Sequence, residues 1–171
     1  TVPGDFSSAA FPLVAAVVVP HSQITLRGVG INETRTGLLG MLRSMGADIR
    51  VSNQAVTGGE LIGDLTVGFA ELHAVDVAGE TVVRAIDEFP VWAVAATQAA
   101  GSSTARDAAE LRVKEVDRIA MLAGELRRLD AAIVALPVSE PGLAEVPLFA
   151  EEFLLVRPHK DAGKPVPSSH I

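Results

Sequence analysis

The sequence predicts an α/β fold in which short strands alternate with helices and the most apolar helices are buried. Residues 7–19 and 88–100 are helix-like segments without a polar face, and a helix that is apolar all round is a buried one. Short runs of alternating polarity, typical of strands, lie between and after them. The order of elements repeats after about 80 residues, Ser8 corresponding to Asp87. We therefore expect two tandem α/β units, with sheet covering the buried helices on more than one side.

Both apolar helices begin after residues that favour a helix start. Asp5, or one of the two serines that follow it, is able to cap the first turn of 7–19. The helix over 88–100 follows Asp87, another cap-type residue, and is expected to stop at Gly101. As a helix cap Asp87 needs no functional role, and capping is the first interpretation of this side chain.

The remaining predicted elements are amphipathic helices and short strands, and the last part of the chain differs in composition. Amphipathic helices are predicted over 36–45 and 115–129. Strands are predicted over 23–29, 48–53, 64–67, 74–77, 103–107 and 130–137, with one or two more within 145–157. The expected division is a first unit over 1–73, an incomplete second unit over 74–129, strands over 130–157 and a loose tail over 158–171.

The composition indicates ample core material and an acidic surface. Of the 171 residues 49% are hydrophobic, and the formal net charge is −7. Nucleic acid is not expected as a partner, because phosphate neutralisation needs a basic face. No membrane span or signal peptide is predicted. The lack of cysteine fits a reducing compartment, so we expect a cytoplasmic protein, and the start at Thr1 rather than Met suggests a processed or trimmed product.

The densest cluster of charge surrounds Lys114 and Arg118. These cations are expected four residues apart on one helical face, where like charges repel, so an anion should lie near them. Glu115 and Asp117 are able to supply it within the chain, which is the usual situation at a charged helix start. The alternative is that the helix start and its two cations bind a phosphate or carboxylate.

Other motif classes are not indicated. The Gly28-Val29-Gly30 segment lacks the spacing of a dinucleotide-binding or phosphate-loop motif. The four histidines are scattered without ligand spacing, so no metal site is predicted. Arg35 is interpreted as a loop arginine that precedes a capped helix.

Four segments, in this order and at this spacing, resemble the EPSP synthase (3-phosphoshikimate 1-carboxyvinyltransferase) family. They are PGDFSSAAF at 3–11, NETRTG at 32–37, IDEFP at 86–90 and LRVKEVDR at 111–118. The resemblance spans residues 2–129 and implies two βαβαββ-type units from the C-terminal domain of that enzyme, with buried helices and outer sheets.

The resemblance also implies a reaction and a set of site residues. The family transfers the enolpyruvyl group of phosphoenolpyruvate to the 5-hydroxyl of shikimate 3-phosphate, with no metal or organic cofactor. By motif, Asp87 would contact the shikimate hydroxyls and act as base, and Lys114 would lie between the substrates. Glu115 would help protonate the methylene carbon, and Arg118 would hold the phosphoenolpyruvate carboxylate.

The family's N-terminal-domain contacts are missing from this sequence, which leads to two hypotheses. In the first, the chain is an inactive fragment or scaffold that retains part of the site and binds either substrate weakly. In the second, it is a working part of the enzyme that needs a complementary domain. Faces that the missing parts would cover are expected to cause self-association, as a dimer for example.

Residues 129–156 show a second, shorter resemblance. The segments LDAAIVALP and EVPLFAEEFLL are similar to the effector domain of LysR-type regulators of the OxyR kind. This resemblance implies a chimera, natural or engineered, with a junction near 127–130. Residues 130–157 would then replace the last strands of the second unit, and no regulatory role follows because the DNA-binding helices and reactive cysteines are missing.

Overall fold

The computed structural model describes residues 2–113, 116–128, 131–135 and 154–158. The first half of the chain forms α1 (Phe6–Val18), β1 (Gln23–Gly30), α2 (Gly37–Ser44), β2 (Ile49–Thr57) and β3 (Glu60–Gly68). The second half forms β4 (Asp76–Val77), α3 (Glu80–Val83), α4 (Phe89–Gln98), β5 (Ser103–Ala105), α5 (Glu110–Val113), α6 (Arg118–Arg128), β6 (Ala131–Ala135) and β7 (Leu154–Pro158). Helices and strands alternate along most of the chain, and the prediction of an α/β fold is confirmed.

The first sheet is antiparallel, with β3 between β1 and β2. Both pairings shift register at the same level of the sheet, and Gly28 (φ 63°) and Asn53 (φ 50°) adopt left-handed backbone there. The carboxylate of Asp64, on the central strand, accepts hydrogen bonds from the Gly28 N–H and from the Asn53 side-chain amide, each at 2.9 Å. One side chain therefore fixes the irregularities of both neighbouring strands.

The second sheet has the order β4-β5-β7-β6. β4 and β5 are parallel and are joined through α3 and α4, as a parallel pair requires a crossover connection. β7 pairs antiparallel with both β5 and β6. The described strands of the predicted region 130–157 thus belong to the same sheet as β4 and β5.

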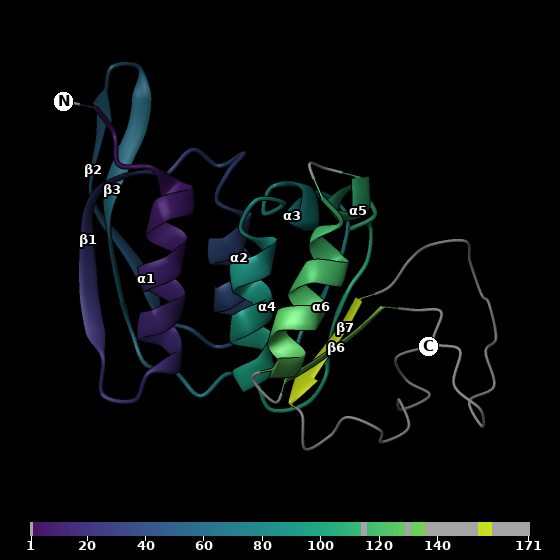
Figure 1. Ribbon diagram of the computed structural model, residues 1–171. Coiled ribbons are helices and arrows are strands. Elements are labelled where there is room, and N and C mark those ends of the chain that lie inside the picture. Colours follow the sequence, from purple (N-terminus) through teal and green to yellow (C-terminus); the bar gives the residue numbers. More distant parts are fainter. Residues whose placement is uncertain (1, 114–115, 129–130, 136–153, 159–171) are drawn as a thin grey trace, which may run out of the picture.

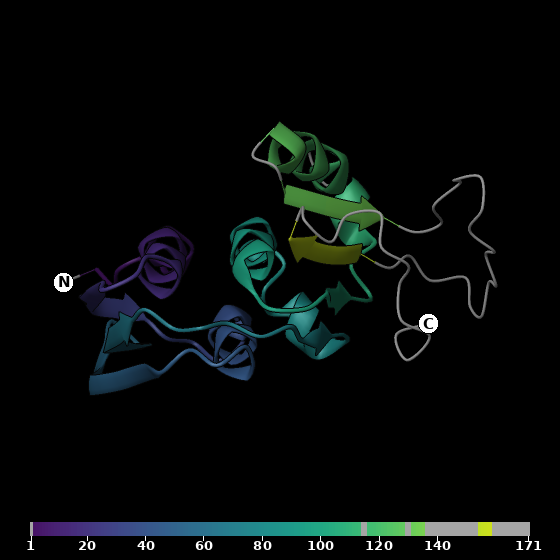
Figure 2. The same ribbon diagram turned by 90° about the horizontal axis from the view of Figure 1, so that it is seen from below.

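α1, α2 and α4 lie between the two sheets, and α6 lies against β6 of the second sheet (Figures 1 and 2). α1 packs on β1 and β3, α4 packs on β7, and α1 contacts α4 across the middle, where α2 also reaches α4. The largest fully buried side chains include Trp92, Phe89, Leu13 and Leu38. Trp92 and Phe89 stack at a centroid distance of 4.9 Å, which places the aromatic part of the core at the start of α4.

Four helices run in the same direction. α1, α2, α4 and α6 all begin at the upper end of the molecule in Figure 1 and end at the lower end. Asp5 fixes the start of α1, because its carboxylate accepts the Ser8 N–H at 2.7 Å. The N-terminal ends of these helices, with the partial positive charge of their free N–H groups, therefore lie on one face.

The prediction that both apolar helices are buried on all sides is wrong for α1. Phe11 is 66% exposed and Val19, at its C-terminal end, is 51% exposed. On α4, Val94 is partly exposed at 37%, whereas its neighbours Ala93 and Ala95 are fully buried. This side of α1 is apolar, and it is exposed because no described element of the chain packs against it.

Two helix starts also differ from expectation. The helix predicted over 115–129 begins at Arg118, because Asp117 accepts the Ala120 N–H and starts a new helix there. Residues 116–117, just before this start, are not helical, and the predicted spacing of Lys114 and Arg118 on one helical face lies outside the described residues. The residue at the cap position of α4 is Glu88, so Asp87, the predicted cap, lies one residue before the observed cap position.

Some predicted features lie outside the described residues. These include the break near residue 150, the tail beyond residue 158, and the side chains of Lys114 and Glu115. The four-residue helix α3 was not predicted, because a single turn is too short to show a periodic pattern.

Candidate functional site

Asp87 lies between two guanidinium groups on the face where the helices begin. Arg118 Nη1 is 3.3 Å from one carboxylate oxygen of Asp87, and Arg35 Nη2 is 3.9 Å from the other. Arg35 comes from the loop before α2, Asp87 from the turn before α4, and Arg118 is the first residue of α6. Three segments distant in sequence therefore bring two positive charges and one negative charge together.

A buried carboxylate and a serine lie next to the group formed by Arg35, Asp87 and Arg118. Glu88 is only 4% exposed, and its carboxylate accepts a short hydrogen bond from the Ser7 hydroxyl. Arg35 Nη2 in turn lies 3.4 Å from the Ser7 oxygen. Since Ser7 belongs to the first turn of α1 and Glu88 stands at the N-cap position of α4, these contacts tie the starts of the two helices together.

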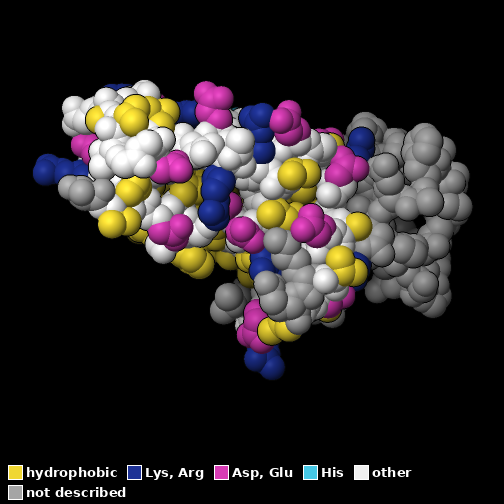
Figure 3. Space-filling model, turned by 90° about the horizontal axis from the view of Figure 1, so that it is seen from above, with side chains coloured by type: hydrophobic (Ala, Val, Ile, Leu, Met, Phe, Trp, Pro, Cys, Tyr) yellow, Lys and Arg dark blue, Asp and Glu magenta, His cyan; other side chains and the backbone are white. Residues whose placement is uncertain are grey.

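The helix starts themselves add to the positive character of the site. The N-terminal ends of α1, α4 and α6 carry partial positive charge, which favours anions. Seen from this end, acidic and basic side chains lie interspersed over the middle of the face (Figure 3). The arrangement is suited to a small ligand with negative groups and hydroxyls, bound by Arg118 and Arg35 and oriented by Asp87.

Two further carboxylates near this face act as helix caps. The Ala120 N–H, as the main cause, holds the pKa of Asp117 below its ordinary value, and Arg112 at 3.2 Å contributes. Hydrogen bonds from Ser8 likewise lower the pKa of Asp5. Both groups stay ionised at neutral pH, and their negative charge is directed at helix N–H groups.

The structure brings together part of the predicted site. Asp87 and Arg118 are in contact, whereas Lys114 and Glu115 lie outside the described residues. Arg35, interpreted from sequence as an ordinary loop arginine, also reaches Asp87. Sequence reasoning missed Ser7 and Glu88 as members of this group. Ser7 lies inside the family-like segment 3–11 and Glu88 inside the segment 86–90. That position was the available sequence signal for a place in the site.

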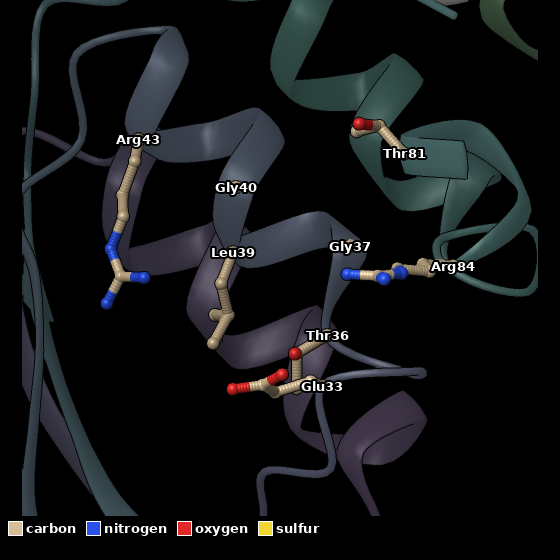
Figure 4. A pocket seen from close by; sticks show the side chains of 8 residues that line it. All are labelled: Glu33, Thr36, Gly37, Leu39, Gly40, Arg43, Thr81 and Arg84. Atoms are coloured by element: carbon tan, nitrogen blue, oxygen red, sulfur yellow. The ribbon is translucent and has the colours of Figure 1, made fainter. Parts of the chain in front are cut away.

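A separate hollow of about 270 Å³ lies where α2 begins beside α3 (Figure 4). It is lined by Glu33, Thr36, Gly37, Leu39, Gly40, Arg43, Thr81 and Arg84. Arg43 donates to the Ile49 carbonyl oxygen and Arg84 pairs with Glu80, so both cations are engaged within the chain. The candidate site remains the Asp87 group, where three segments distant in sequence converge at the helix starts.

Metal and membrane features were searched over the described residues only. Among them, no three histidine or acidic side chains gather in a way that would hold a metal ion. In that same part of the chain, every helix is too short or too polar to cross a bilayer.

These features define an α/β protein with a candidate anion-binding site where parallel helices begin. Residues 1–144 match the family model of EPSP synthase (3-phosphoshikimate 1-carboxyvinyltransferase). The chain belongs to the EPSP synthase family.

Individual relatives agree with this assignment. A 3-phosphoshikimate 1-carboxyvinyltransferase from Geobacter sp. (strain M21) is 53% identical over 136 residues, which are 80% of this chain and 32% of the relative. The enzyme of the same name from Geobacillus kaustophilus is 46% identical over 160 residues, 94% of this chain and 37% of the relative. The solved EPSP synthase of Acinetobacter baumannii matches with a TM-score of 0.77 at 37% identity, covering 92% of this chain and 32% of that one. The chain thus spans about a third of the length of the relatives that it matches.

The predicted regulator-like segment receives no support from these comparisons. The family match continues past the predicted junction near 129 to residue 144, and the Geobacillus alignment extends over 160 residues. Neither a LysR-type segment nor a chimera follows from them, whereas the fragment-like coverage of the family does.

Proposed function

We propose that this chain contributes the C-terminal-domain side of a 3-phosphoshikimate 1-carboxyvinyltransferase site and does not catalyse the reaction alone. The observation that carries the proposal is the position of Asp87 between Arg35 and Arg118, on the face where α1, α4 and α6 begin. A carboxylate base flanked by guanidinium groups suits a substrate that carries both hydroxyl and anionic groups.

Each charged residue has a role in this proposal. Asp87 contacts the hydroxyls of shikimate 3-phosphate and accepts the proton of its 5-hydroxyl as the new carbon–oxygen bond forms. Arg118 holds the phosphoenolpyruvate carboxylate, and Lys114 lies between the substrates. Glu115 delivers a proton to the methylene carbon, which becomes a methyl group; this group then loses a proton as phosphate leaves, and the carbon–carbon double bond forms again. No metal or organic cofactor is required.

The openness of the site supports the view that the chain alone is inactive. The side chain of Asp87 is 44% exposed and that of Arg35 is 58% exposed, so water has free access to both. Electrostatic catalysis requires preorganised charge around the reacting group in a site from which water is excluded. A chain that spans about a third of its relatives' length offers one wall of such a site.

The chain is proposed to be one continuous fragment of an enzyme of this family, with two units that each contain one of the two sheets. The first unit, 1–73, contains β1–β3, and the second, 74–129, contains β4, β5 and α6. Strands β6 and β7, from the predicted region 130–157 and the residue that follows it, extend the second sheet. The family match through residue 144 favours this view over a chimera.

Phosphate release tests the proposal directly. The chain is mixed with shikimate 3-phosphate and phosphoenolpyruvate, with and without the N-terminal domain of the Geobacter relative. We expect no release from the chain alone and release when the domain is added. The Asp87→Ala variant should abolish the restored activity, whereas Asp48→Ala, in an exposed pair with Arg50 on β2, should retain it.

Each opposite outcome has a distinct meaning. Release by the unaccompanied chain overturns the claim of inactivity alone. If the added domain restores nothing and a titration followed by NMR shows no binding of shikimate 3-phosphate, the proposed half-site is wrong.

A further inference from the structure

Glu88 is a buried acidic side chain that the proposed reaction does not use. Glu88 directly follows Asp87 in the sequence, but its side chain points into the protein, and the residue is only 4% exposed. Burying a carboxylate is costly unless it is hydrogen-bonded or compensated by positive charge. Here the Ser7 hydroxyl donates to it, and its place at the cap position of α4 sets it at the positive end of that helix.

Ser7 connects this buried carboxylate to the exposed site. Its hydroxyl proton is directed at Glu88, which leaves its oxygen lone pairs facing Arg35 Nη2 at 3.4 Å. The same Nη2 atom lies 3.9 Å from Asp87. A serine hydroxyl accepts from a cation best when its own proton is held elsewhere, so the Glu88 carboxylate orients Ser7 as an acceptor.

We propose that Glu88 and Ser7 are positioning residues that hold the Arg35 guanidinium beside Asp87. The inference rests on the proposed function for the purpose of this arrangement, although the arrangement itself is testable without any substrate. An arginine side chain in an exposed loop has many rotamers, and holding one of them before the ligand binds lowers the entropy cost of binding. The pair also spans 81 residues, so it keeps the starts of α1 and α4 in register.

The test compares two adjacent serines in the first turn of α1. Ser7 faces Glu88 and lies near Arg35, whereas the Ser8 hydroxyl bonds to Asp5, whose carboxylate acts on Arg35 through its charge and keeps the Ser8 N–H as a partner in Ser8→Ala. Arg35 mobility is measured by NMR as the exchange of its Nε–H proton with water. We expect Ser7→Ala to speed this exchange about threefold or more, and Ser8→Ala to leave it unchanged.

Glu88→Gln provides a conservative variant, because its amide oxygen still accepts from the Ser7 hydroxyl. It should keep Arg35 exchange closer to the parent value than Ser7→Ala does. Urea unfolding, followed by the fluorescence of Trp92, the only tryptophan, verifies that each variant is folded under the conditions compared. Equal Arg35 exchange in the parent, Ser7→Ala and Ser8→Ala overturns the positioning role, whatever the variants do to stability.

Substrate binding separates this inference from the proposed function. Shikimate 3-phosphate is titrated into the parent and both serine variants, and Ser7→Ala should bind it about fivefold more weakly. Faster Arg35 exchange in Ser7→Ala, together with no binding by the parent, supports the positioning role and rejects the half-site. Binding by the parent with unchanged affinity and unchanged Arg35 exchange in Ser7→Ala supports the half-site and rejects the positioning role.

Discussion

Arg118 Nη1 lies 3.3 Å from Asp87 Oδ1, and this contact joins the first residue of α6 to the turn before α4. The proposed base and the proposed carboxylate-binding residue therefore neutralise each other when no ligand is bound. An arriving anion must displace part of this pair to reach Arg118. Pairs with this degree of exposure contribute about 0–1 kcal/mol, so the competition is modest.

Asp87→Asn is expected to strengthen anion binding while it removes the base. Without the competing carboxylate, the isolated chain should bind phosphoenolpyruvate up to about fivefold more tightly. In the mixture with the complementary domain, phosphate release should fall to background, because an amide does not accept the hydroxyl proton. Calorimetric titration measures the affinity for phosphoenolpyruvate, and the release assay measures the activity. Weaker binding by Asp87→Asn would contradict the competition between Asp87 and the anion for Arg118.

Gly37→Ala and Gly40→Ala, both in α2, should change stability in opposite directions. A Cβ at Gly37 would meet three backbone atoms at 2.8 Å, including Ala85 N and Thr81 O, so α2 and α3 would be forced apart. We expect a loss of about 1–3 kcal/mol in the free energy of unfolding. A Cβ at Gly40 meets nothing within 4 Å, and alanine there should add up to about 1 kcal/mol. Urea unfolding followed by Trp92 fluorescence measures both.

Asp64→Asn should lower the free energy of unfolding at neutral pH and make that free energy less dependent on pH in the acid range. The Asn53 amide and then the Gly28 N–H lower the pKa of the Asp64 carboxyl in the folded state. A carboxyl with a lower folded than unfolded pKa stabilises the fold above about pH 4 and loses that contribution as pH falls further. The variant should show a smaller decrease in unfolding free energy between neutral and acid pH.

Asp48→Asn is the matched control, since its exposed carboxylate pairs only locally with Arg50 on the same sheet. Its unfolding curves should follow those of the parent at each pH. The pKa values of Asp5 and Asp117 are also lowered, so some acid sensitivity should remain in Asp64→Asn. Identical pH profiles for the parent and Asp64→Asn would show that this carboxylate does not hold the two bulges.

Self-association through the exposed side of α1 is the fourth prediction. Phe11 is 66% exposed, and contact with a second copy of the chain would bury this apolar surface. Sedimentation velocity should show association that increases with concentration, and Phe11→Ser should shift it toward monomer. Val56→Ser, at a 71% exposed position on β2, is the control. A parent chain that remains monomeric at all concentrations would contradict the prediction.

Local sequence patterns predicted the helices better than the contacts between distant segments. The repeat assigns Ala15 to Val94 and Ala16 to Ala95, and in each pair burial agrees, the first exposed and the second buried. The placement of β7 between β5 and β6 was not predictable, because strand pairing depends on long-range contacts that no local pattern encodes.

The candidate site shows the same contrast. Asp87 and Arg118 were singled out through motif resemblance, yet their contact depends on where α6 begins, and Asp117 sets that start by accepting the Ala120 N–H. An acidic residue before an amphipathic run is typical of a helix cap, so the sequence pattern is compatible with this role for Asp117. From the sequence alone, Asp117 is instead interpreted as a partner of the nearby cations. The link between Ser7 and Glu88 depends on packing of α1 against α4, which neither segment reveals by itself.

The common direction of α1, α4 and α6 gives the two ends of the molecule unequal tolerance to change. The described contacts of the Asp87 group come from residues at helix starts or just before them, so a shift of any of these starts displaces a charge. The connections 19–22 and 99–102 leave the opposite ends of α1 and α4, beside a hollow of about 600 Å³. Insertions or deletions in those turns would act far from the charged face, and their cost would fall on local backbone contacts such as the hydrogen bond from the Ala100 N–H to the Leu72 carbonyl oxygen.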